Sequence, residues 1–155
     1  MREEVLLIGE VKVFDQPVVM KCYGLGSCVG LFVKDRRSGI TGGAHIFLPE
    51  ATHDFSFVEN MSAGDCVQHM LEQMREKGAS LETMRAKIAG GSNVLMNFNG
   101  IGSRNTNAVI DALLRNRIYI AARDVGGIIS RTVEFNSNSE QLVVRQLEWN
   151  STEIF

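Results

Sequence analysis

Cys28 is the residue in this sequence best placed to act as a nucleophile. It follows two glycines at the junction between two apolar runs, within residues 24–30, GLGSCVG. Glycine lets the backbone turn tightly and leaves no side chain to block a substrate. Such a turn can also direct neighbouring N–H groups toward one point, as an oxyanion hole requires. The segment therefore predicts a thiol nucleophile with oxyanion or substrate-binding groups at Gly26 and Ser27, although Ser27 fits an ordinary turn equally well.

His45 is the natural base for this cysteine. The thiolate is the nucleophilic form, and an ordinary thiol with a pKa of ~8.5 is only slightly ionised near neutrality. His45 lies seventeen residues after Cys28, and a protonated imidazole nearby would also lower the pKa of the thiol. The pair predicts a cysteine hydrolase. A buried, inert cysteine and a histidine that only packs in a sheet would fit the same residues, so the pattern alone leaves the function open.

Phosphate, metal and nucleic-acid sites find little support. The GxG at Gly24 and Gly26 has Val29 where GxGxxG requires glycine, and no GK[ST] follows. The histidines are eight and sixteen residues apart without a CxxC or HxxxH pair, so no zinc site is expected. The formal net charge of -2 and the lack of a basic cluster argue against nucleic acid. We expect no metal or organic cofactor.

The chain as a whole has the composition of one globular domain spanning residues 1–155. Hydrophobic residues make up 45% and charged residues 22% of the sequence, which is enough to build a core. The first residues lack the pattern of a secretion signal, and no apolar run approaches the ~20 residues needed to span a bilayer. We therefore expect a cytoplasmic protein whose three cysteines are free thiols.

The first half of the chain is predicted to form strands. Short β-branched or aromatic runs lie at residues 5–8, 11–14, 18–23, 29–33 and 41–49. Residues 35–39, DRRSG, are typical of a hairpin turn, so the runs on either side should pair antiparallel. That pairing would bring Cys28 and His45 toward the same end of a sheet.

The second half mixes helices with strands. Apolar residues at helical spacing predict a helix over 62–77, ended by Gly78, and a second over 104–117, with Ser103 as its N-cap. Further strands are expected at residues 84–89, 118–125, 131–135 and 141–147. Residues 150–155 are expected to be a frayed tail. Short turns between most neighbouring strands favour an α+β layered fold over a doubly wound one.

Five segments in order resemble the chemoreceptor glutamine deamidase family, CheD. They are LGSCVGLFV, GGAHIFLP, KIAGGSNV, IGSRNTNAV and DVGGIISRTVEF, and the pairing of GSCV with GGAH is the specific part. The resemblance implies a single-domain α/β/β sandwich with mixed, largely antiparallel sheets and two main helices, similar to the catalytic domain of deamidating bacterial toxins. It implies deamidation of glutamines on methyl-accepting chemoreceptors, with Cys28 as nucleophile and His45 as base. The family also binds a CheC-type phosphatase.

One position departs from the family pattern. Six residues before the nucleophile, where the family usually has a threonine that completes the triad, this sequence has Cys22. A thiol is a poorer hydrogen-bond partner than a hydroxyl, so His45 is oriented either by Cys22 or by another group. Cys22 is equally well explained as a packing residue, and oxidation to a disulfide with Cys28 is a further hypothesis. The glycine-rich segments 90–93 and 126–127 either line the cleft or serve close packing.

Two other functions remain open at this point. One is a binding protein that keeps the fold but chiefly docks on a chemotaxis phosphatase or a receptor, with weak catalysis because the threonine is missing. The other is a deamidase of a different cytoplasmic protein. Cys66 is expected to pack in the first helix and His69 to face solvent. His53 lies in a polar loop after Pro49 that could border substrate, although no specific pattern supports that role.

Overall fold

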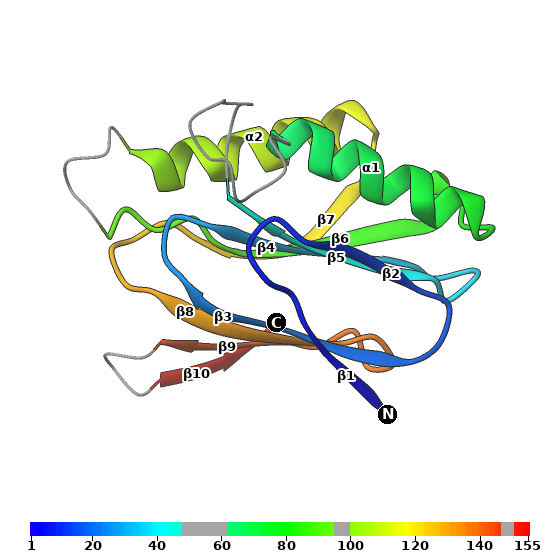
Figure 1. Cartoon of the computed structure of the whole chain (residues 1–155), viewed down its shortest axis with the longest axis horizontal. Coiled ribbons are helices and arrows are strands. Elements are labelled where there is room, and N and C mark those ends of the chain that lie inside the picture. The colour runs from blue at the N-terminus through cyan, green and yellow to red at the C-terminus, as the bar shows by residue number, and fades with distance from the viewer. Residues whose placement is uncertain (48–61, 95–99, 147–150) are drawn as a thin grey trace.

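The molecule is built in three layers, as the computed structural model in Figure 1 shows. Residues 1–47, 62–94, 100–146 and 151–155 are described. Two helices cover one face of a five-stranded sheet, and a second five-stranded sheet packs against the other face. Both sheets contain one parallel pair and are otherwise antiparallel. The expected α+β class with mixed, largely antiparallel sheets is confirmed.

The middle sheet holds the strands on which Cys28 and His45 depend. In order across the sheet its strands are β2 (Val11–Phe14), β5 (Thr41–Ile46), β4 (Val29–Asp35), β6 (Met84–Gly90) and β7 (Tyr119–Val125). β4 pairs antiparallel with β5, as the hairpin turn predicted, and Gly30 lies opposite His45. The start of β4 and the end of β5 therefore meet at one end of the sheet.

The outer sheet consists of strands from both ends of the chain. In order they are β1 (Arg2–Val5), β3 (Val18–Leu25), β8 (Arg131–Asn136), β9 (Leu142–Gln146) and β10 (Ser151–Ile154). β1 runs parallel to β3, and the remaining pairs are antiparallel. This sheet supplies the second wall of the layer that contains Cys28.

Two apolar cores follow from the alternation of side chains along the middle strands. On β4, Leu31 and Val33 face the helices and belong to the core that contains the buried residues of both helices. Phe32 faces the outer sheet and stacks on Phe135 of β8, with ring centroids 5.2 Å apart. Cys28 also belongs to this second core. The nucleophile candidate thus lies between the two sheets.

The first helix, α1 (Ala63–Glu76), is close to its expected position. Ser62 is its N-cap and accepts a hydrogen bond from the N–H of Asp65 at 3.1 Å. Gly78 follows the helix with a φ of 108°, a backbone conformation that favours glycine. Gly42 on β5 lies under the helix, where an added Cβ would fall within 2.7 Å of Met70. The short 3₁₀ helix η1 (Leu81–Thr83) leads from α1 into β6.

The second helix, α2 (Ile101–Arg115), begins three residues before the expected start. Its N-cap is Gly100, not Ser103, so that prediction is wrong. Ser103 instead lies in the first turn, where its N–H donates to the side-chain oxygen of Asn93 at 3.3 Å. The helix can begin earlier because Gly102 has no side chain and packs directly on the backbone of Ser92. A tertiary contact therefore decides this boundary. Among the described residues, no helix is long and apolar enough to cross a membrane.

Two expectations about the chain ends are wrong. The first strand is Arg2–Val5 instead of residues 5–8, because the chain leaves the sheet after Leu6, whose N–H still donates to the Lys21 carbonyl at 2.8 Å, and Leu7 and Ile8 are exposed. The expected frayed tail instead forms β10. It pairs with β9, and the N–H groups of Leu142 and Phe155 each donate to the other residue's carbonyl at 2.8 Å. Backbone pairing and the packing of Phe155 on the inter-sheet core fix this segment.

Candidate functional site

Cys28 and His45 lie at the same end of the middle sheet and on the same face. Gly30, two residues after Cys28, is the partner of His45 in the antiparallel ladder. Side chains two residues apart on a strand share a face, and Gly43 faces Met20 of the outer sheet, so His45 also faces that sheet. Cys28 is 8% exposed and His45 is 4% exposed. The structure therefore brings the two predicted residues into one buried layer.

The imidazole of His45 is held through one ring nitrogen only. Its Nδ1 lies 3.0 Å from the backbone carbonyl oxygen of Leu6. A carbonyl can only accept, so Nδ1 carries the proton and Nε2 keeps its lone pair when the ring is neutral. Nε2 is buried and has no hydrogen-bond partner among the described residues. This tautomer leaves the nitrogen that a general base needs available.

Burial controls the protonation of both groups. Desolvation lowers the pKa of His45, although the Leu6 carbonyl and the charge of Glu10 act in the opposite direction. Desolvation raises the pKa of the Cys28 thiol to about 11, with its own backbone N–H opposing that shift. Both side chains are therefore neutral near pH 7 in the free protein. The arrangement suits proton transfer from the thiol to the imidazole during attack, and not a preformed ion pair.

The loop that carries Cys28 is held in place by hydrogen bonds that its backbone carbonyl groups accept. The Gly26 carbonyl accepts hydrogen bonds from the backbone N–H and the hydroxyl of Ser92, at 2.9 and 2.8 Å. The Ser27 carbonyl accepts from the side-chain amide of Asn105 at 2.8 Å, and the Cys28 carbonyl accepts from the N–H of Gly91 at 2.8 Å. The glycine-rich segment at 90–93 therefore supports the nucleophile loop by close backbone packing.

Cys22 lies on β3 of the outer sheet and is completely buried. Desolvation, and secondarily the charge of Cys28, raise the pKa of its thiol to about 12. Its Sγ would be 3.5 Å from a Cβ added to Gly30. Leu6, not Cys22, makes the hydrogen bond to Nδ1 of His45. All three cysteines are free thiols. An orienting role for Cys22 thus stays a prediction that this geometry does not require.

Arg131 fixes the second glycine-rich segment. Its guanidinium lies 3.2 Å from the carboxylate of Asp124 and donates to the carbonyls of Gly90 and Gly126 at 3.2 and 2.7 Å. The arginine is only 4% exposed. It therefore ties the turn at 126–127 to the segment that supports the Cys28 loop.

Neither Asn105 nor the Leu6 carbonyl was predicted from the sequence as a site residue, whereas Ser92 lies in the segment 90–93, which was expected to line the cleft or to serve close packing. Asn105 had a detectable signal, because it shares the inward face of α2 with Val109 and Ala112 at helical spacing. A polar side chain in an apolar stripe requires a specific partner. No sequence signal marks the Leu6 carbonyl, because every residue carries that group.

Cys66 and His69 lie on α1, on the other side of the middle sheet from Cys28. Cys66 is buried in the helix-side core, as expected, and His69 is exposed, with its ring 2.8 Å from the Gln73 amide. His53 lies outside the described residues. Within the described ranges, no group of three or more His, Cys, Asp or Glu side chains could hold a metal ion.

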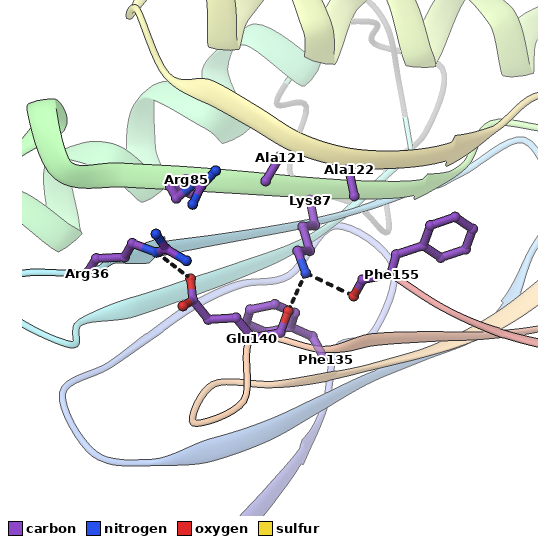
Figure 2. A pocket seen from close by; sticks show the side chains of 8 residues that line it. All are labelled: Arg36, Arg85, Lys87, Ala121, Ala122, Phe135, Glu140 and Phe155. Carbon is purple, nitrogen blue, oxygen red and sulfur yellow. Dashed lines mark hydrogen bonds and ion pairs between the residues drawn. The ribbon is translucent and has the colours of Figure 1, made fainter.

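A cavity of about 220 Å³ lies farther along the layer between the sheets (Figure 2). Lys87 reaches into it from β6 and donates to the carbonyls of Glu140 and Phe155. Arg36 forms an ion pair with the Glu140 carboxylate at 3.3 Å. The cavity is smaller than the ~300–1,000 Å³ typical of small-molecule sites, and no cysteine or histidine lines it. We therefore place the candidate site at Cys28.

Fold and site together define the class of protein: a layered α/β/β sandwich with a cysteine and a histidine at the adjoining ends of two paired strands. Comparison with known proteins makes this specific. A family model described as CheD chemotactic sensory transduction matches residues 47–146, which is more than half of the sequence. The chain belongs to the CheD family.

Individual relatives match over almost the whole chain. The chemoreceptor glutamine deamidase CheD of Thermotoga maritima is 34% identical over 146 residues, covering 94% of this chain and 92% of that protein. The probable chemoreceptor glutamine deamidase CheD 2 of Geobacter metallireducens is 37% identical over 148 residues, covering 91% of each. The probable chemoreceptor glutamine deamidase CheD of Haloarcula marismortui is 34% identical over 147 residues, covering 93% of this chain and 85% of that protein. The family-model match begins after His45, so the roles of Cys28 and His45 depend on the geometry.

Proposed function

We propose that this protein hydrolyses glutamine side chains of methyl-accepting chemoreceptors to glutamate, releasing ammonia. The observation that carries the proposal is the buried Nε2 of His45, unpaired within the described chain, on the same sheet face as Cys28. The names of the relatives support the substrate class, since each is a known or probable chemoreceptor glutamine deamidase. The reaction is that of a protein-glutamine glutaminase, an amidohydrolase.

The first half of the reaction forms a thioester. Nε2 of His45 accepts the thiol proton as the sulfur of Cys28 attacks the carboxamide carbon. Negative charge develops on the carboxamide oxygen, where the N–H groups of Ser27 and Cys28 stabilise it. The imidazolium then gives its proton to the amide nitrogen, which leaves as ammonia. A glutamyl thioester on Cys28 remains.

The second half restores the thiol. His45 accepts a proton from a water molecule, which attacks the thioester carbon at the same oxyanion site. When the tetrahedral intermediate collapses, the sulfur leaves and takes the proton back from the imidazolium. The products are a glutamate side chain and the free thiol, and the cycle uses no group beyond this chain, the substrate and water.

The cellular setting forms part of the same proposal. A cytoplasmic location would place the enzyme beside the signalling regions of its receptors. A CheC-type phosphatase is the proposed partner, through which the availability of the deamidase would follow signalling. Co-purification of the two proteins tests that association separately from the activity.

The test is deamidation of a purified receptor fragment under reducing conditions. We expect ammonia release and a mass increase of about one unit at defined glutamines, both abolished in Cys28→Ala. The Cys66→Ala variant is the matched control, because that thiol is also buried but lies on α1, in the core on the other side of the middle sheet. Absence of ammonia release from the wild-type protein would contradict the proposal and favour a docking role. Activity toward other proteins only would change the substrate.

A further inference from the structure

The loop before β4 has three consecutive carbonyl groups that are each held by a donor. The donors come from the Gly91–Ser92 segment and from Asn105 on α2, and they bind the carbonyls of Gly26, Ser27 and Cys28. In a trans peptide the carbonyl and the next residue's N–H point in opposite directions, and the described chain has no cis peptide. The N–H of Ser27 therefore points away from Ser92, which holds the Gly26 carbonyl. The N–H of Cys28 points away from Asn105, which holds the Ser27 carbonyl.

The next feature of this loop is its two N–H groups, those of Ser27 and Cys28. Among the described residues, neither the N–H of Ser27 nor that of Cys28 donates to an acceptor on another residue. Two adjacent donors beside a thiol form the arrangement that an oxyanion hole requires. The direction of each N–H is set by the residue that donates a hydrogen bond to the carbonyl of the same peptide group.

We propose that Asn105 and Ser92 are positioning residues that build the oxyanion hole by fixing these two peptide groups. Ser92 would fix the group between Gly26 and Ser27, and Asn105 the group between Ser27 and Cys28. This inference rests on the proposed deamidase function and extends it to residues that do not touch substrate.

Asn105 also links the two strands of the site. Its amide nitrogen donates to the Ser27 carbonyl at 2.8 Å and to the Phe47 carbonyl at 3.0 Å. The ladder between β4 and β5 ends at the pair Val29–Ile46, so the amide connects the two chain segments just beyond it. One side chain thus sets the spacing between the strand ends that carry Cys28 and His45.

The environment of Asn105 favours a positioning role over a purely stabilising one. The residue is completely buried, and its Oδ1 has no hydrogen-bond partner among the described residues. A buried acceptor without a partner costs about 1–3 kcal/mol, so an apolar residue here would avoid that cost. The fold retains the amide at the position where its two donors hold the nucleophile loop.

Ser92 acts on the preceding peptide group in the same way. It is completely buried, and its N–H and hydroxyl both donate to the Gly26 carbonyl. The adjoining glycines let this segment approach the loop backbone to backbone, since a Cβ on Gly90 would collide with the Cys28 carbonyl. Ser92→Ala removes one of the two donors and leaves the other, so its effect should be the smaller.

The experiment compares deamidation with alkylation of Cys28 in Asn105→Ala and Ser92→Ala. Deamidation develops an oxyanion, whereas alkylation of the thiol by iodoacetamide does not. For Asn105→Ala we expect kcat to fall about 10–100-fold and KM to change less than about 3-fold, with the alkylation rate within about 3-fold of wild type. For Ser92→Ala we expect a fall in kcat of about 3–10-fold.

Asn116→Ala is the matched control, because its amide donates to the Ala112 carbonyl at 2.8 Å at the far end of the same helix. We expect it to leave both rates unchanged. A readout independent of catalysis is the NMR shift of the Ser27 carbonyl carbon and the Cys28 amide nitrogen, which Asn105→Ala should move and Asn116→Ala should not.

The proposal is overturned if folded Asn105→Ala deamidates at the wild-type rate, or if deamidation and alkylation fall in parallel. If Asn105→Ala does not fold, Ser92→Ala decides in the same assays, with the Gly26 carbonyl carbon and the Ser27 amide nitrogen as the NMR readout. A wild-type protein that releases no ammonia would instead refute the proposed function, and the NMR comparison would still test whether Asn105 fixes the peptide group.

Discussion

The two ends of β4 differ in how far their buried polar groups are hydrogen-bonded. Asp35 ends the strand, is 1% exposed, and accepts hydrogen bonds from two hydroxyls and two backbone N–H groups, those of Ser38, Thr83, Arg37 and Ser80. Burial alone would raise its pKa, but these hydrogen bonds lower it to about 2. Each carboxylate oxygen of Asp35 therefore accepts two hydrogen bonds.

At the Cys28 end, polar atoms are buried without partners among the described residues. These atoms are Nε2 of His45 and Oδ1 of Asn105, and the N–H groups of Ser27 and Cys28 likewise donate to no other residue in the described part of the chain. The same fold gives the Asp35 carboxylate four hydrogen-bond donors at one end of the strand. At the other end it leaves two N–H groups and Nε2 of His45 without partners on other described residues. A buried polar group that makes all its hydrogen bonds indicates a structural role, whereas one without a partner indicates a place for a ligand. The comparison predicts that mutations at the Cys28 end affect rate, and mutations at the Asp35 end affect stability.

The largest expected effect is at the nucleophile. Cys28→Ala should lower kcat for receptor deamidation by at least about 10⁴-fold, because no other group can form the thioester. Its free energy of unfolding should change by less than about 1 kcal/mol, because only a small side-chain group is lost. Ammonia release and urea unfolding measure the two quantities. Residual deamidation above 1% of wild type, an approximate threshold, would exclude Cys28 as the nucleophile.

The next effect concerns the base. His45→Asn should lower kcat/KM by about 10²–10⁴-fold. In the wild type, burial lowers the pKa of His45, so kcat/KM should fall with decreasing pH through a midpoint below the usual ~6.5, where the imidazole becomes protonated. A pH–rate profile with the receptor fragment measures this. An acidic limb with the same midpoint in His45→Asn would show that another group titrates.

Asp35→Asn should change stability while leaving the rate unaltered. The folded-state pKa lies below the unfolded value of 3.8, so the carboxylate stabilises the protein above that pH and loses its effect as the pH falls toward about 2. We expect a loss of about 2 kcal/mol at pH 7 that shrinks below pH ~4, measured by urea unfolding. Asp111→Asn, on the exposed face of α2, is the control. A lower kcat of Asp35→Asn at temperatures where that variant is folded would show that the Asp35 end of the strand also affects the rate.

Cys22→Thr should have the smallest effect on rate. The Leu6 carbonyl already fixes the tautomer of His45, so kcat should stay within about 3-fold of wild type or rise. The buried hydroxyl should cost about 1 kcal/mol of stability in its apolar surroundings. Steady-state kinetics and thermal unfolding measure both. A tenfold or larger increase, as an approximate limit, would show that a hydroxyl at position 22 completes the orientation of His45; a large loss would count against that role.

Most elements of the fold could be predicted from local patterns. Short β-branched or aromatic runs predicted β2 and β4, a strand was expected where β6 lies, and apolar residues at helical spacing predicted α1. The errors lay where tertiary contacts override local preference. α2 begins early because Gly102 packs on Ser92, and the last residues form β10 because β9 offers them a pairing edge. That residues 1–155 form a single domain remains a prediction.

The sequence by itself determined that Cys28 and His45 share one end of a sheet. The hairpin turn at 35–39 fixes the register of β4 and β5, and register is a local property of the turn. It also pointed to the CheD family, which the comparisons confirm.

Only the tertiary structure decided what holds these residues. The proton on Nδ1 of His45 depends on the Leu6 carbonyl, and the Ser27 carbonyl is held by Asn105. These contacts span 39 and 78 residues of chain. Leu6 acts through a backbone group that every residue carries, and the partner of Asn105 is set by the packing of α2. The sequence therefore named the proposed nucleophile and base, whereas long-range packing set the tautomer of His45 and the surroundings of both residues.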